Sequence, residues 1–149
     1  MLRFNELIEN LILRTKKGNL KWEKLSQNDK DTIRTIVDGD VLDAFYASDN
    51  ECRIAVFECD RWMFDKMGIS ATEVVLFAVE SEGKWYVFDD RSYRSESDND
   101  ENAELVKVLG SIFRLYRLVK QYMQSKDEPN GVFQKYMERV LSPENGFAN

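Results

Sequence analysis

The chain has 149 residues, of which 27 are acidic, 21 are basic and none is histidine, so its net charge is −6. This length suits one domain that buries about two-thirds of its unfolded surface, without help from a disulfide or a structural metal. The hydrophobic content of 43%, with 2 prolines and 7 glycines, is typical of a globular chain rather than a disordered or fibrous one. We expect residues 1–149 to form a single domain.

The sequence predicts a cytoplasmic protein that is not integral to a membrane. Acidic and amide residues interrupt the apolar residues near the N-terminus, which is unlike a signal peptide. The apolar runs are much shorter than the roughly 20 residues that span a bilayer. Cys52 and Cys59 are seven residues apart in one predicted strand, so they face opposite sides and we expect both to be reduced.

Helical signals alternate with short extended ones in the first forty residues. Apolar residues at helical spacing predict a helix over residues 4–16, which Gly18 can end in a left-handed conformation. Leu20 and Trp22 alternate with charged residues, as in an edge strand or a tethered extended segment. Ser26 and Asp29 form a capping box, which predicts a second helix over residues 28–37.

The middle of the chain predicts two β-hairpins. Residues 42–46 and 52–59 form the first, and residues 60–70, which have no clean period, are expected to be a helical turn or a packed loop. Residues 74–81 and 85–90 form the second around Glu82-Gly83. Apolar bulk on both faces of residues 85–88 means that helices or a partner must cover both faces of the sheet.

The last third of the sequence is helical. Residues 91–102 are polar and predict a solvated loop, and an apolar stripe predicts a long helix over residues 103–125. A short final helix over residues 132–141 should pack on the same body and ends before Pro143. The predicted fold class is α+β, with an antiparallel sheet of four or five strands and flanking helices.

The residue types argue against most catalytic chemistries. Because the chain has no histidine, it cannot form a Ser-His or Cys-His nucleophile. The spacing of the two cysteines does not match that of a zinc site. No phosphate-binding glycine motif occurs, and the calcium-loop-like run from Asp98 has Ala103 and Leu109 where the loop needs Gly and Glu. We therefore expect no catalytic residues, no metal and no cofactor.

Two functional alternatives remain open. A small-molecule-binding domain would use an aromatic pocket with an acid to orient the ligand, formed by Trp62, Trp85, Tyr86 and Asp89. A metal-dependent hydrolase would use the Glu82-Gly-Lys84 sequence, which has the E-x-K form of some nucleases, together with another acid.

Charge is segregated along the chain, and this favours a protein partner. Residues 1–24 hold 6 basic and 3 acidic groups, residues 25–104 hold 8 and 20, and residues 105–149 hold 7 and 4. An acidic central region repels nucleic acid and suits a basic protein partner, with a candidate binding run of Glu96, Asp98, Asp100 and Glu101. We expect a non-enzymatic protein-binding role of the immunity, inhibitor or accessory type, and a homodimer is compatible with the apolar sheet faces.

The residues after the first predicted helix resemble a pattern found in other proteins. Thr15, Gly18, Leu20 and Trp22 make a T-x-x-G-x-L-x-W pattern that follows a short amphipathic helix and precedes strand-rich sequence. This resembles small bacterial proteins of uncharacterised activity, often carried on mobile elements. The resemblance implies an α+β fold and a bacterial origin.

Overall fold

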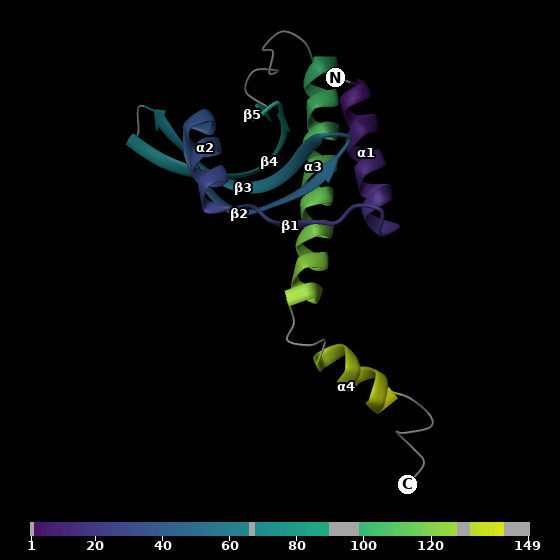
Figure 1. Cartoon of the computed structure of the whole chain (residues 1–149). Coiled ribbons are helices and arrows are strands. Elements are labelled where there is room, and N and C mark those ends of the chain that lie inside the picture. Colours follow the sequence, from purple (N-terminus) through teal and green to yellow (C-terminus); the bar gives the residue numbers. More distant parts are fainter. Residues whose placement is uncertain (1, 66–67, 90–98, 128–131, 142–149) are drawn as a thin grey trace.

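The computed structural model describes residues 2–65, 68–89, 99–127 and 132–141 (Figure 1). Within these ranges the chain forms four helices and one antiparallel sheet of five strands, whose order follows the chain, so the predicted α+β class is confirmed. The elements are α1 (Leu2–Lys16), β1 (Glu23–Lys24), α2 (Gln27–Val37), β2 (Gly39–Asp49), β3 (Cys52–Asp65), β4 (Gly68–Ser81), β5 (Lys84–Phe88), α3 (Asn99–Asp127) and α4 (Val132–Leu141).

Helices cover both faces of the sheet, as the apolar alternation of the strands requires. On one face, which we call the α3 face, Phe45, Val56 and Phe77 pack against α1 and α3. On the other, which we call the α2 face, Phe57, Leu76 and Trp85 pack with Ile33 and Val37 of α2. Because neighbouring residues of a strand point to opposite faces, the two cores alternate residue by residue along β3 and β4.

The turn after α1 fastens this helix to the sheet. Gly18 has a φ of 75°, and the N–H groups of Gly18 and Asn19 donate to the carbonyls of Thr15 and Arg14, which ends the helix as predicted. The indole of Trp22 is buried and donates to Thr15 Oγ1 at 3.0 Å. The extended segment from Leu20 is therefore anchored in the core, and it pairs with β2 at Glu23–Lys24, where the predicted segment ends.

The capping box at the start of α2 is present. Ser26 Oγ accepts a hydrogen bond from the Asp29 N–H at 3.2 Å and donates to the Asp29 carboxylate at 3.0 Å. Asp38 ends the helix in the left-handed conformation, and its N–H donates to Arg34 O. Gly39 follows at once and starts β2, so the chain reverses from helix to sheet without a linker.

The expectation of a helical turn or loop over residues 60–70 is wrong, because β3 continues to Asp65 and β4 begins at Gly68. Trp62 lies opposite Ala71 and Phe64 lies opposite Ile69, whereas β2 pairs with β3 only as far as Arg61, and β5 pairs with β4 only from Phe77. The end of this hairpin is thus a two-stranded ribbon that reaches away from α3 (Figure 1). The sequence lacks a clean apolar period here because Trp62 and residues 68–71, whose side chains are described, are all exposed.

The two C-terminal helices lie close to where the sequence predicts them, but two features differ from the prediction. The long helix begins at Asn99 rather than 103, so residues 99–102 are helical and not loop, and an acidic first turn suits the positive end of a helix. Residues 90–98 of the predicted loop lie outside the described residues. Helix α4 has the predicted bounds, but residues 135–141 are all exposed, so the expectation that it packs on the body is wrong for these side chains. Among the described residues, no helix is long and apolar enough to cross a membrane.

Two glycine substitutions test the close contact at the start of β2. A Cβ at Gly39 would lie 2.4 Å from the backbone oxygen of Asp60, whereas a Cβ at Gly110 in α3 would meet nothing within 4 Å. Gly39→Ala should lower the free energy of unfolding by about 1–3 kcal/mol, because backbone has to move. Gly110→Ala should raise it by about 0.5–1 kcal/mol, because alanine is the better helix former. Urea denaturation measures the free energy of unfolding of both variants. Equal changes in the two variants would contradict the close contact at Gly39.

Candidate functional site

A part-buried ionic cluster on the α2 face joins α2 to the sheet. The guanidinium of Arg53 in β3 donates to both oxygens of the Asp29 carboxylate, at 2.9 and 3.2 Å. It also donates to both oxygens of Glu80 in β4, with Nε at 2.8 Å from Oε1. The fixed fork of an arginine suits two carboxylates at once. Arg53 thus connects the N-terminus of a short helix with two central strands.

Aromatic rings enclose the same guanidinium. Its central carbon lies 5.3 Å from the ring centre of Tyr46 and 5.1 Å from that of Trp85. The indole N–H of Trp85 donates to Asp29 Oδ1 at 3.4 Å. Bonds to Glu80 and Asp29 raise the pKa of Arg53, and the bonds from Arg53 lower the pKa of Asp29. The hydrogen bonds of Arg53, Asp29 and Glu80 lie within the protein, so the cluster joins α2 to the sheet.

The four residues of the predicted aromatic pocket do not come together. Trp85 is 3% exposed and lies on the α2 face in the Arg53 cluster, whereas Tyr86, 56% exposed, lies on the opposite face. Trp62 is 45% exposed and alternates with Val56, which places it on the α3 face. The Asp89 carboxylate lies 3.5 Å from the Arg61 guanidinium. None of the four lines the pocket described below.

The predicted acidic and E-x-K residues give no metal site in the described structure. Glu82 has a φ of 53° and forms the β4–β5 turn with Gly83, so Glu82 and Lys84 are exposed at a turn. Glu96 and Asp98 lie outside the described residues, and the side chains of Asp100 and Glu101 are likewise not described. Over the described ranges, no three His, Cys, Asp or Glu side chains are grouped to hold a metal ion.

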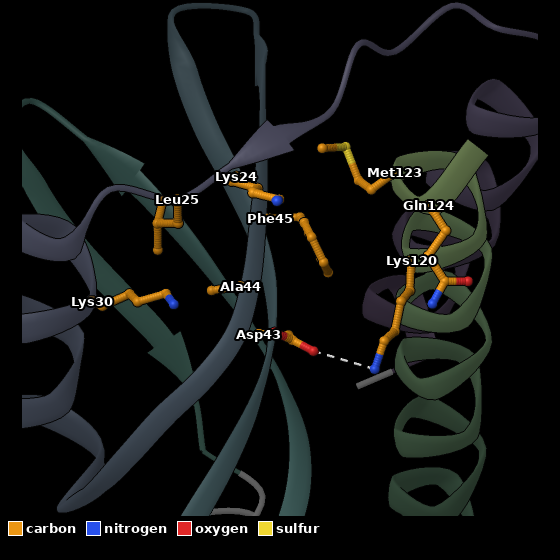
Figure 2. Close-up of a pocket in the computed structure, with 9 residues that line it drawn as sticks. All are labelled: Lys24, Leu25, Lys30, Asp43, Ala44, Phe45, Lys120, Met123 and Gln124. Atoms are coloured by element: carbon orange, nitrogen blue, oxygen red, sulfur yellow. Dashed lines mark ion pairs between the residues drawn. The ribbon is translucent and has the colours of Figure 1, made fainter. Parts of the chain in front are cut away.

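A pocket of about 400 Å³ opens beside β2, where β1 ends (Figure 2). The register of β2 against β3 shifts between Val41 and Ala44, which makes a bulge, and the Leu25 N–H donates to Ala44 O at 2.9 Å. The pocket therefore lies at an interrupted strand edge, between α2 and α3. Bulges of this kind often lie next to binding sites.

Buried apolar residues and lysines line this pocket. Leu25, Ala44, Phe45 and Met123 are each less than 7% exposed and form its apolar part. Lys24 from β1, Lys30 from α2 and Lys120 from α3 reach it from three separate elements (Figure 2). Lys120 Nζ lies 3.2 Å from Asp43 Oδ2 and 5.7 Å from the Tyr116 ring centre. We call this the lysine pocket.

The outer part of the β3–β4 hairpin is the second notable surface. All residues from Gly68 to Glu73 are exposed, and among the described strands none pairs with β4 before Phe77 on the side away from β3. Ile69 is 66% exposed on the same face as Trp62. Asp60 lies opposite Glu73 on this face, and Asp60 Oδ1 is buried with no hydrogen-bond partner. We call residues 60–65 and 68–76 the arm.

Sequence reasoning missed both surfaces. The three lysines are distant in the chain, and only the fold brings them together. The bulge that opens the pocket has no signal in residues 41–44. For the arm, the β-branched and small residues from Ile69 to Val75 were a usable strand signal, which the unpatterned residues 60–65 obscured. Comparison of the chain with protein-family models, curated proteins and solved structures gives no match.

Replacing the guanidinium by an ammonium tests the Arg53 cluster. Arg53→Lys keeps the charge but removes the fork, so the free energy of unfolding should fall by about 2–3 kcal/mol. Arg34→Lys is the matched control, because its pair with Asp40 is largely exposed and contributes less than about 1 kcal/mol. Chemical denaturation of the two variants gives the comparison, and a loss of similar size in both would contradict the assigned role of Arg53.

The Asp29 carboxylate should make stability depend on pH in acid. The pKa of this carboxyl is lower in the folded chain than its ordinary value. The ionised carboxylate therefore stabilises the fold fully at pH values above the ordinary pKa. This stability is lost as the pH falls through the folded pKa. Asp29→Asn should therefore show a smaller drop in unfolding free energy between about pH 7 and pH 3 than the unmodified chain. Asp31→Asn, exposed on the same helix, should keep the full drop. Identical pH profiles for all three chains would contradict this role of Asp29.

Proposed function

We propose that the protein is a non-enzymatic binding protein that captures an extended segment of another protein along the outer edge of β4. The observation that carries this proposal is the exposure of every residue from Gly68 to Glu73 beyond the end of β5. An edge strand presents N–H and C=O groups to a further strand, and a peptide can extend the sheet there. Proteins usually protect such edges with lysine or proline, and residues 68–76 contain neither.

The charge of the arm selects the partner's chemistry. Asp60 and Glu73 face each other across the β3–β4 ladder, and like charges so placed repel unless a cation lies between them. Asp60 Oδ1 is buried and accepts no hydrogen bond from any described residue, so part of this negative charge is left without a partner. A partner segment with lysine or arginine places a cation near the two carboxylates. The net charge of −6 also attracts a basic partner over a distance of about one Debye length.

The apolar part of the arm adds affinity. Trp62 and Ile69 are both exposed on the α3 face of the ribbon. In strand addition the backbone bonds supply affinity, while alternate side chains of the partner meet pockets and apolar groups that supply specificity. The predicted partner segment therefore alternates apolar and basic residues. An immunity, inhibitor or accessory role agrees with such capture.

Selection from a library of displayed peptides tests this proposal. The full chain should enrich basic peptides rich in β-branched residues, whose binding weakens at high salt because exposed charges are screened. The double variant Ile69→Lys, Ala71→Lys should reduce their affinity about tenfold or more, because it sets lysines against a basic strand. The matched control is Leu7→Lys, Leu13→Lys, which places the same charges at exposed leucines of α1 and should bind normally.

Three results would count against the proposal. Enrichment of acidic peptides, or equal binding to the arm variant and the α1 variant, would exclude the β4 edge as the site. The absence of any enriched peptide would have the same meaning. Concentration-dependent dimerisation that the arm substitutions abolish would assign the edge to a second copy of this chain instead, and sedimentation of the free protein measures it.

A further inference from the structure

We propose that the lysine pocket binds a small organic anion, a carboxylate or phosphate carried on an apolar ring or chain. The pocket lies at the β2 bulge, beside α2 and α3, and the residues that line it are all different from those of the arm. The proposal is therefore independent of the capture of a protein segment. Its volume of about 400 Å³ is within the range of small-molecule sites.

The charge around the pocket is the first argument. The described residues that line it include three lysines and one carboxylate, that of Asp43, in a chain whose residues 25–104 carry 20 acidic and 8 basic groups. A lysine ammonium without a carboxylate partner attracts an anion. Lys120 is held by Asp43 and Lys24 also interacts with another group, whereas Lys30 makes no ion pair with any described residue. Its ammonium points into the pocket (Figure 2).

The apolar residues are the second argument, because they distinguish this pocket from a surface patch of lysines. Phe45, Leu25 and Met123 are buried from solvent yet still form part of the pocket lining. A hydrated inorganic anion gains nothing from such a surface, whereas an apolar ring or chain buries area against it at about 25 cal/mol per Å². The combination of an apolar floor with a few placed polar groups is typical of organic ligand sites.

The position of the lysines is the third argument. Lys24 is the last residue of β1 and lies opposite Phe45, Lys30 is in the first turn of α2, and Lys120 extends from α3 near the Tyr116 ring. Arg53 fixes α2 through Asp29, the residue before Lys30, so the Lys30 backbone is preorganised. An anion bound at Lys30 would lie between α2 and β2, at a place where the sheet itself is interrupted.

Titration of the ¹⁵N-labelled full chain with phenyl phosphate, inorganic phosphate and benzyl alcohol tests the proposal. Phenyl phosphate should bind with a Kd below about 1 mM and shift the amide signals of Lys30, Ala44 and Phe45. Inorganic phosphate and the neutral alcohol should each bind at least about fivefold more weakly, because one lacks the ring and the other lacks the charge. High salt should weaken the binding of phenyl phosphate.

Matched lysine substitutions locate the site. Lys24→Gln and Lys30→Gln should each weaken phenyl phosphate about fivefold, whereas Lys107→Gln, exposed on α3 and outside the pocket, should leave its affinity unchanged. Unchanged amide spectra of the free variants confirm that each still folds. Absence of saturable binding, equal losses in all three variants, or shifts centred away from residues 24–45 would overturn the proposal. Equal affinity for inorganic and phenyl phosphate would overturn its organic part.

Discussion

The fork of the Arg53 guanidinium holds together three elements that are far apart in the sequence. Through Asp29 it fixes the first turn of α2, through Glu80 it bonds β4, and its own strand is β3. Helix α2 has only 11 residues and is the described helix that covers its face of the sheet, so its orientation depends on this contact as well as on Ile33 and Val37. Short helices gain most of their stability from tertiary contacts of this kind.

Both candidate sites lie where the regular sheet stops. The arm extends beyond the last pairing of β3 with β2, at Arg61, and of β4 with β5, at Phe77. The lysine pocket lies where a bulge interrupts β2 beside the end of β1. Their charges are opposite: carboxylates at Asp60 and Glu73 in the arm, ammoniums at Lys24 and Lys30 in the pocket. The two proposed ligands therefore bind independently. Both α2 and α3 border the pocket and pack on the sheet from which the arm extends.

The sequence predicted those elements whose signals are local. The Ser26–Asp29 capping box located α2, and Gly83 located the β4–β5 turn. The arm was missed because residues 62–65 pair, among the described strands, only with β4, and period-2 alternation is weak where side chains such as Trp62 and Ile69 are exposed. Alternation correctly separated Trp85 from Tyr86, but only the fold shows that Trp85 packs on Arg53. The lysine pocket depends on three distant residues, which no local pattern could reveal.

Amide hydrogen exchange with a selected basic peptide bound measures strand addition most directly, because it reports backbone hydrogen bonds rather than affinity. The account predicts that outward-pointing amides of residues 68–76 exchange rapidly in the free chain and become protected in the complex, while amides of α1 and the β2 bulge keep their rates. Protection that appears in the helices, or none in β4, would contradict capture at the β4 edge and remove the basis of the proposed function.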